Sequence, residues 1–206
     1  MLYNFWIIST YLYMQTYMLT SGAAPCSLEG MMGYSWDYAQ QVHYPHYSHQ
    51  VGKLFFKTPR KCEVFGISCE GSAKQVFYLA DEGQSHGKGA NAVVSQDHNY
   101  LNTYGLGEQH AHFQCDNCCG QNKNNIVIWY LLWRVLVGLH RSITLSFMLV
   151  GHTKFTPDWH FGIWKSKWRN FNAETLPDVA ASVALSSRTG HNIPQLVGDT
   201  SNPVVI

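Results

Sequence analysis

The stretch that decides the fold is residues 110–150, which read HAHFQCDNCCGQNKNNIVIWYLLWRVLVGLHRSITLSFMLV. The first residues, 110–115, alternate between polar and apolar side chains, which is typical of a strand with one buried face. Residues 124–139 form a long apolar run and predict a helix that is buried on much of its surface. Residues 142–150 are strongly β-prone and predict a central strand. A strand–helix–strand unit of this kind allows the two strands to lie adjacent and parallel.

The residues on either side predict a hairpin and two further helices. Three strands are expected upstream, at 33–42, 61–70 and 75–82, the last two joined by the short turn GSAKQ. Residues 90–104 carry apolar side chains at helical spacing and end in the glycine-containing sequence GLGE. After Pro157 and Asp158, residues 159–171 can form a helix, and the chain past about 186 is polar and loop-like.

This order of elements predicts a mixed five-stranded sheet with helices on both faces, an α/β fold. We expect one domain over 31–185. Residues 1–30 are expected to be an aromatic N-terminal extension outside the core, because 2–19 carry no charge and match neither a signal peptide nor a membrane span well. Residues 186–206 are expected to be a C-terminal tail that is cut short.

Three aspartates stand at the edges of apolar runs in a chain with only 13 acidic residues. Asp37 lies in the first strand, Asp116 follows the fourth strand, and Asp158 precedes the last helix. Carboxylates that meet at strand ends can hold two Mg²⁺ or Mn²⁺ ions, which clamp the attacking and leaving oxygens of a phosphodiester. The alternative is that Asp116 and Asp158 are helix N-caps, a position that aspartate suits well.

Basic residues gather near the last two aspartates although the formal charge of the whole chain is only +1. Seven basic residues and one acid lie between 120 and 170, which suits a polyanionic substrate. A solvated helix face is the alternative. The basic residues are Lys123, Arg134, Arg141, Lys154, Lys165, Lys167 and Arg169.

Other motifs offer weaker alternatives. The cluster His110-x-His112-x-x-Cys115-x-x-Cys118-Cys119 has zinc-ligand residue types, but no distant partner pair completes a finger. The sequence GQSHGKG at 83–89 falls short of a phosphate-binding loop by one residue and lacks the following Ser or Thr. Trp164 and Trp168 are spaced to stack on bases or, as is more usual at helical spacing, to fill a core.

Several longer segments of the sequence resemble a known family. DYAQQVHYP, FKTPRKCEVFGISCEG, DEGQSHGKGAN, DNCCGQNKNN, YLLWRV, SITLSFMLVGHTKFTPDWHFG and PQLVG look like an uncharacterised domain that is abundant in transposon-derived eukaryotic proteins. The likeness covers about 34–198, and the element order resembles the ribonuclease H-like fold of DDE/DDD transposases and integrases. The resemblance implies a metal-dependent DNA nuclease or strand transferase whose triad is Asp37, Asp116 and Asp158.

The same resemblance implies the cofactor and the partners. It implies two Mg²⁺ or Mn²⁺ ions on the triad, no small-molecule cofactor, DNA as the partner, no membrane partner, and nuclear rather than secreted or membrane-anchored protein. The resemblance leaves open whether the chain forms a homo-oligomer. The alternative is a catalytically silent, domesticated module that binds nucleic acid or protein on the same fold. Residues expected to contact DNA phosphates are Asn117, Lys123, His152, Lys154, Lys165, Lys167 and Arg169.

Overall fold

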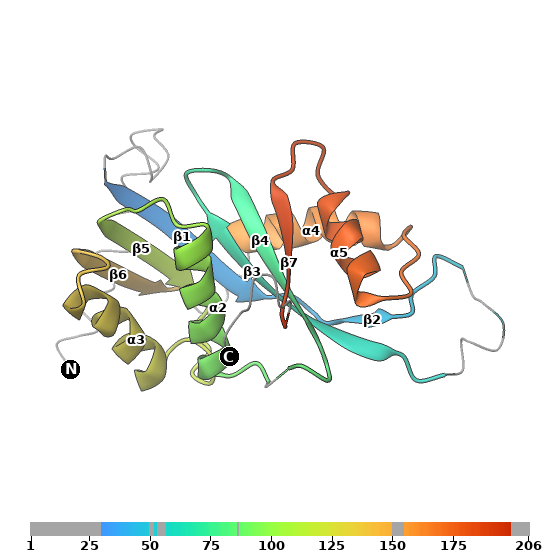
Figure 1. Ribbon diagram of the computed structural model, residues 1–206, viewed down its shortest axis with the longest axis horizontal. Helices are drawn as coiled ribbons and strands as arrows, with labels where there is room; N and C mark the ends of the chain where they lie inside the picture. The colour runs from blue at the N-terminus through green and yellow to red at the C-terminus, as the bar shows by residue number, and fades with distance from the viewer. Residues whose placement is uncertain (1–29, 50–51, 53–56, 86, 150–154, 199–206) are drawn as a thin grey trace.

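One mixed sheet organises the chain, which the computed structural model describes over residues 30–49, 52, 57–85, 87–149 and 155–198 (Figure 1). The fold is mixed α/β, and within these ranges the sheet has seven strands. The strands are β1 (Met31–Tyr38), β2 (Val42–Tyr44), β3 (Arg60–Cys69), β4 (Lys74–Asp81), β5 (His110–Cys115), β6 (Ser142–Phe147) and β7 (Asn192–Leu196). The helices are α2 (Ala90–Thr103), α3 (Asn125–Leu136), α4 (Thr156–Trp168) and α5 (Leu176–Ala184).

The strands follow the order β6-β5-β1-β3-β4-β7, and β2 pairs with β3. β3 pairs antiparallel with β1 and with β4, and the short turn between β3 and β4 makes that pair a hairpin. β5 and β6 continue the sheet in parallel with β1, since α2 and α3 return the chain across the sheet before each strand. β7 adds to the other side in parallel with β4.

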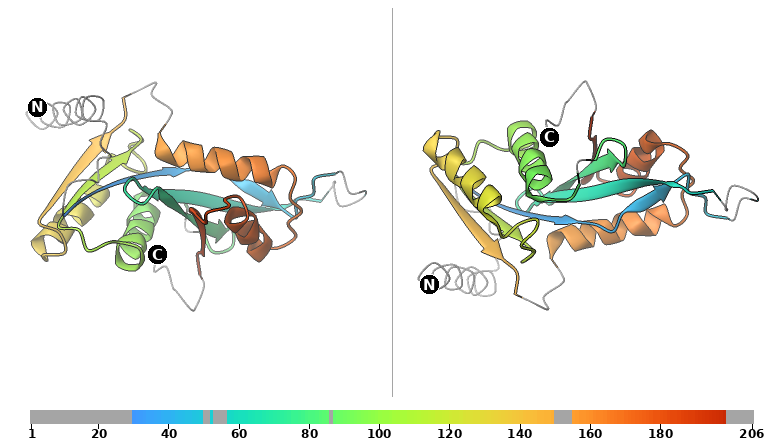
Figure 2. Two further views of the ribbon diagram at one scale, coloured as in Figure 1. Left: turned by 90° about the horizontal axis from the view of Figure 1, so that it is seen from above. Right: turned by 90° about the horizontal axis from the view of Figure 1, so that it is seen from below.

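Alternation along β1 separates two buried clusters on opposite sides of the sheet. Tyr34 and Trp36 pack with residues of α2 and α3 in one cluster. Phe161 and Trp164 of α4 pack with Phe77 of β4 in the other. Figure 2 shows α4 on one side of the sheet and α2 and α3 on the other. Helices therefore cover both faces, as the sequence predicts.

The expected count of five strands is wrong, because β2 and β7 were not foreseen. β2 has only three residues and lies in a segment whose proline and histidines indicate a turn-rich connection. β7 contains Pro194 and lies in the polar region past 186, which was expected to be loop-like. Both strands owe their form to pairing with a partner strand, which local sequence does not reveal. The helix α5 was also not foreseen.

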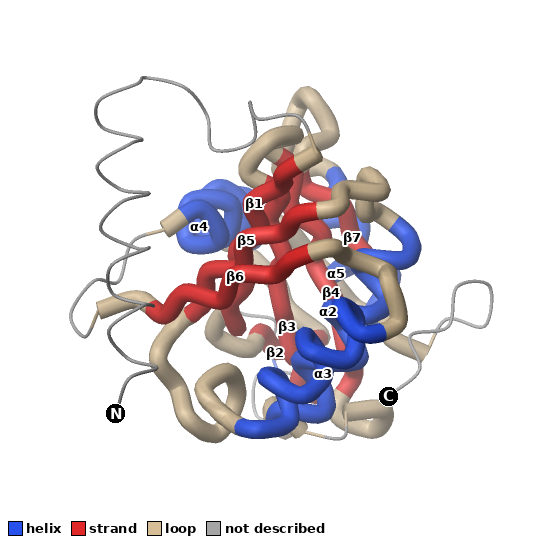
Figure 3. Tube along the Cα trace, turned by 90° about the vertical axis from the view of Figure 1, so that its left-hand side faces the viewer, coloured by secondary structure: helices blue, strands red, loops and turns tan. Residues whose placement is uncertain are grey.

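The predicted topology of the strand–helix–strand unit is confirmed, but the predicted burial of its helix and of its second strand is wrong. β5 and β6 are adjacent and parallel, and α3 connects them. However, β6 is the outermost strand on its side of the sheet, as Figure 3 shows, and not a central one. The α3 residues that are buried are Val127, Leu131 and Arg134, so most of this helix faces outward. An apolar run in the sequence does not show which face of a helix is covered by the rest of the protein. It also does not show how many strands lie beyond a given strand in the sheet.

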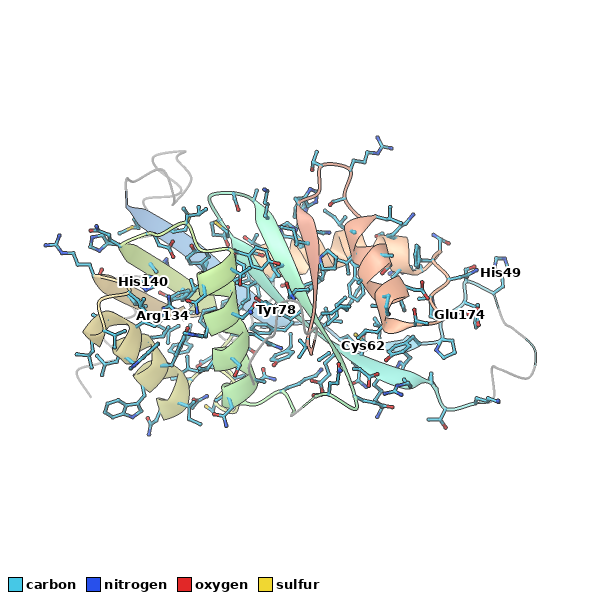
Figure 4. The ribbon with its side chains drawn as sticks, in the orientation of Figure 1. His49, Cys62, Tyr78, Arg134, His140 and Glu174 are labelled. Atoms are coloured by element: carbon cyan, nitrogen blue, oxygen red, sulfur yellow. The ribbon has the colours of Figure 1, made fainter. Side chains whose placement is uncertain are left out.

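Arg134 is the charged residue on the inner side of α3. Its guanidinium donates to Tyr130 Oη at 3.0 Å and to His140 Nδ1 at 3.3 Å. His140 in turn lies 3.4 Å from a carboxylate oxygen of the buried Glu108. Figure 4 shows Arg134 and His140 next to each other beside α3. A buried cation needs such partners, so these bonds tie α3 to the edge of the sheet.

Over the described ranges, no helix is both long and apolar enough to cross a membrane.

Candidate active site

Asp37 lies near the carboxyl end of β1, between the antiparallel and the parallel halves of the sheet. Its backbone pairs with Gly66 of β3, and its predecessor Trp36 pairs with Cys115 of β5. Because strand side chains alternate and Trp36 points toward α2 and α3, Asp37 points toward α4. One carboxylate oxygen accepts from the backbone N–H of Tyr38 at 2.8 Å.

Asp116 directly follows Cys115 and so lies beside Asp37 on the neighbouring strand, about 4.8 Å away in backbone spacing. Its carboxylate Oδ1 accepts from the N–H of Cys118 at 3.2 Å, which closes a tight turn. The same oxygen accepts from the side-chain amide of Asn122. The carbonyl oxygen of that amide accepts from the buried indole N–H of Trp36 at 2.9 Å. This chain of bonds fixes the position of Asp116 relative to β1.

The loop after Asp116 is further held by its asparagines. Asn124 is the N-cap of α3, and its side-chain oxygen accepts from the N–H of Val127 at 3.1 Å. Its amide donates to the carbonyl of Cys119 at 3.2 Å. The suggested role of Asp116 as an N-cap is therefore wrong, since Asn124 occupies that position. A cavity of about 500 Å³, lined by Cys119, Gly120 and the first residues of α2, lies beside this loop.

Asp158 lies in the first turn of α4, where its carboxylate accepts from the N–H of Phe155 at 3.3 Å. It is the third helical residue and not the N-cap. Phe161, one turn further on and on the same face of the helix, packs against Gly66. Gly66 is the backbone partner of Asp37. The close packing of α4 on β3 thus brings the start of the helix over the carboxyl end of β1.

The electrostatics show that Asp116 and Asp158 act on Asp37. Burial, together with the negative charges of Asp116 and Asp158, raises the pKa of Asp37 to about 7, although the Tyr38 N–H acts in the opposite direction. The structure thus brings Asp116 and Asp158 into electrostatic range of Asp37. As they are placed, no three His, Cys, Asp or Glu side chains in the described ranges are grouped tightly enough to hold a metal ion.

The donor set nevertheless fits a hard cation in its chemistry. Carboxylate oxygens are the ligands that Mg²⁺ and Mn²⁺ prefer. Burial and the two neighbouring carboxylates raise the pKa of Asp37, and one backbone N–H lowers it. A bound divalent ion would relieve this repulsion and return Asp37 to its charged form at neutral pH.

Glu70 is a fourth acid near this site that sequence reasoning missed. It follows β3, and its carboxylate accepts from Ser35 Oγ at 2.7 Å and from Thr156 Oγ1 at 2.8 Å. Ser35 is on the same face of β1 as Asp37, and Thr156 is the first residue of α4. Glu70 therefore fastens the start of α4 to the sheet. Its position at the end of a strand was the available signal, and it is the same signal that identified Asp116.

The residues expected to contact DNA are not all brought to the three aspartates. Asn117 and Lys123 are exposed in the loop after Asp116, and the Lys123 ammonium lies 5.6 Å from the centre of the Phe147 ring. His152 and Lys154 lie outside the described residues. Lys165, Lys167 and Arg169 are at the far end of α4, on the order of 10–17 Å from Asp158 along the helix axis. Arg134 is buried, so it adds to the count of basic residues in the sequence but not to the charge on the protein surface.

The histidine–cysteine cluster and the tryptophan pair do not form the suggested sites in the described part of the chain. Along β5, His110 and His112 face Ser142 and Ser146 of β6, while Cys115 points to the buried side with α2 and α3. The histidines and this cysteine therefore cannot share a zinc ion. Trp164 and Trp168 fill the core, and the Trp164 indole donates to Ser182 Oγ at 2.9 Å, so neither is available to stack on a base. The described cysteines are free thiols.

Comparison with known proteins gives one family match. Residues 57–198 match the family described as a domain of unknown function, DUF7869. The matched range begins after Asp37 and includes Asp116 and Asp158 as well as β7. No curated protein and no solved structure matches the chain.

Proposed function

The chain belongs to the DUF7869 family, and we propose that it is a transposase- or integrase-like domain that cleaves or transfers DNA phosphodiesters with divalent metal ions. The observation that carries this proposal is that Asp37, near the end of β1, lies within electrostatic range of Asp116 after β5 and of Asp158 in the first turn of α4. Burial, together with the charges of these two acids, raises the pKa of Asp37 to about 7.

The topology supports a ribonuclease H-like core for this domain. An antiparallel β1-β3-β4 unit continues into the parallel strands β5 and β6, and helices cover both faces. The first acid is on the first strand, the second follows the fourth expected strand, and the third is at the last expected helix. This is the placement that the resemblance to DDE/DDD enzymes implies. DNA as substrate makes nuclear localisation part of the proposal.

The residues have separate roles in this proposal. Asp37, Asp116 and Asp158 would hold the Mg²⁺ or Mn²⁺ ions through their carboxylate oxygens. Bound ions would supply an activated water or 3′-hydroxyl and would stabilise the leaving oxygen. Asn122 holds Asp116 through its amide, and Glu70 holds the start of α4 through Thr156. Asn117 and Lys123 are exposed in the loop after Asp116, from which they would contact a phosphate.

A catalytically silent binding module is the second candidate, and one observation favours it. Asp116 and Asp158 each have a structural bond within their own turn, to the N–H groups of Cys118 and Phe155. Both residues thus have a reason to be aspartate without any metal. Such a module would bind DNA through its exposed basic residues and leave it uncut.

Nicking of supercoiled DNA in the presence of Mg²⁺ or Mn²⁺ separates the two candidates. The parent chain should cut with either metal and stop when the metal is chelated. Asp116→Asn should reduce cutting by at least about 100-fold, because it removes the charge of a metal ligand and keeps its shape. Its binding to DNA should persist and weaken steeply with salt, since phosphate contacts release counterions.

The matched control is Glu82→Gln, which removes an exposed acid from the turn after β4, away from the three aspartates. This variant should cut like the parent. A parent that binds DNA but never cuts it would support the silent module. An Asp116→Asn variant that cuts as fast as the parent would exclude the proposed catalytic role of Asp116.

A further inference from the structure

The outward side of α3 is a continuous apolar surface. Trp129 is 66% exposed and Leu136 is 75% exposed, although both lie in the most apolar helix of the described chain. Ile126, Ile128, Leu132 and Trp133 are also exposed on this helix, and Val137 and Leu139 are exposed directly after it. We refer to the exposed apolar residues between 126 and 139 as the α3 face. In Figure 1 the helix lies at one end of the molecule, beside the edge strand β6.

The size of the α3 face exceeds what a lone domain usually leaves open. An aromatic side chain carries about 150–250 Å² of surface and an aliphatic one somewhat less, so the eight residues, each about half-exposed or more, leave on the order of 800 Å² open. The largest apolar patch on a monomer is typically about 300–600 Å². A stable complex of two proteins buries about 800 Å² on each partner. The α3 face alone therefore has the area that one half of a stable dimer requires.

The pattern of the α3 face suits another helix of the same kind. Ile126, Trp129, Trp133 and Leu136 recur at alternating spacings of three and four residues, which places them in one row along the helix. The charged residue of α3, Arg134, points inward and is bonded to Tyr130 and His140. Two copies of this face can therefore meet without burying a charge, and without the charge pairing that would select a different partner.

We propose that the α3 face binds the α3 face of a second copy of this chain, so that the protein is a two-fold symmetric dimer. An uncharged apolar row is self-complementary, which is the requirement for an interface that uses the same patch twice. Trp129 and Trp133 are the anchors, because buried tryptophans dominate the energy of such contacts. α3 lies on the side of the sheet opposite α4, so the dimer leaves α4 uncovered and does not depend on the proposed function of the aspartates.

Light scattering coupled to size-exclusion chromatography of the full chain, without DNA or metal, tests the proposal. The parent should have about twice the chain mass of 23.4 kDa. Trp129→Glu should weaken the dimer by about 30-fold or more, because it places an unpaired charge at the centre of the interface. Leu106→Glu is the matched control, since Leu106 is 64% exposed in the loop before β5, outside α3. This variant should remain dimeric.

Circular dichroism establishes that each variant is folded, and Leu136→Gln serves as a milder change on the same face if Trp129→Glu does not fold. A parent chain that runs as a monomer, or as an aggregate of mixed sizes, overturns the proposal. The monomer result would mean that another part of the chain or another protein covers α3. A dimer that survives both Trp129→Glu and Leu136→Gln also overturns it, because the interface would then lie elsewhere.

Discussion

A single buried amide determines where the second aspartate stands. The Asn122 side chain accepts from the Trp36 indole of β1 and donates to Asp116 after β5, so it joins the two strands that carry the first two acids. Trp36 is fully buried, and its N–H has Asn122 as its hydrogen-bond partner. The position of Asp116 therefore depends on residues that have no part in the proposed chemistry.

Asn122→Ala should lower the free energy of unfolding by about 1–3 kcal/mol, because the buried indole N–H of Trp36 loses its acceptor. Urea denaturation followed by tryptophan fluorescence measures this loss. Asn117→Ala, five residues earlier and exposed, is the control and should change stability by less than about 0.5 kcal/mol. Equal stabilities of the two variants would contradict the role assigned to Asn122.

In the absence of metal, loss of the Asp37 proton should lower the free energy of unfolding as the pH rises toward 8. Its folded pKa of about 7 is above its ordinary value of 3.8, so the folded state holds this proton when the unfolded chain has already lost it. The contribution to stability is complete below pH ~4 and is lost as the pH rises through ~7. Thermal unfolding between pH 4 and 8 should show the loss in the parent and a flatter profile in Asp37→Asn.

Two further measurements sharpen the pH prediction. Glu82→Gln, which changes an exposed acid, should keep the profile of the parent. Addition of Mg²⁺ at pH 8 should raise the melting temperature of the parent more than that of Asp37→Asn, since a bound cation favours the charged carboxylate. Identical profiles for parent and Asp37→Asn would show that Asp37 is not perturbed as its surroundings imply.

At the scale of elements, a glycine sets how close α4 comes to the sheet. Gly66 of β3 has no side chain, and the Phe161 ring of α4 fills the space above it. A Cβ at Gly66 would lie 2.6 Å from Phe161 Cζ, far inside van der Waals contact. Because Asp37 pairs with Gly66 and Asp158 precedes Phe161 by one turn, this contact also sets the separation of the two acids.

Gly66→Ala should therefore destabilise the fold by about 1–3 kcal/mol, as expected when a methyl group is forced into a packed core. The control is Gly162→Ala on the exposed side of the same helix, where an added Cβ would meet no atom within 4 Å. That change should raise stability by about 0.5–1 kcal/mol, since alanine favours a helix over glycine. Chemical denaturation of both variants checks the prediction, and a neutral Gly66→Ala would show that α4 is not seated tightly on β3.

At the scale of the whole molecule, the strand near the end of the described chain completes the sheet. β7 pairs with β4 from Gln75↔Asn192 to Leu79↔Leu196, and Val197 adds a further backbone bond to Leu79. The side-chain oxygen of the buried Asn192 also accepts from His160 Nδ1 at 2.6 Å, which links β7 to α4. The sheet would otherwise leave β4 as an unpaired edge.

Ending the chain after Gly190 should therefore remove several kcal/mol of stability, because the paired backbone of β4 and the partner of His160 are lost together. Ending it after Gly198 retains β7 and should preserve a cooperative unfolding transition like that of the full chain. Calorimetry of the two shortened chains distinguishes these outcomes. A chain ending at Gly190 that unfolds as cooperatively as the full chain would show that β7 is dispensable.

The topology around residues 110–150 could be predicted from sequence because period-two and helical patterns are local properties. The boundaries of β5 agree with the prediction, and the crossover through α3 makes β5 and β6 parallel, as expected. The burial of α3 and the edge position of β6 could not be predicted, because both depend on how many elements lie beyond them. The short β2 and the proline-containing β7 were missed for the same reason.

The sequence by itself determined which residues are candidates: three aspartates at the ends of apolar runs, with asparagines and lysines after the second. Residue type and spacing along the chain are enough for that, since they decide where strands end. The tertiary structure alone decided that Asp116 and Asp158 come within electrostatic range of Asp37, that Glu70 bonds the first residue of α4, and that Arg134 is buried while the outward side of α3 is exposed. Such facts depend on contacts between segments far apart in the chain, and local patterns carry no information about the distance between them.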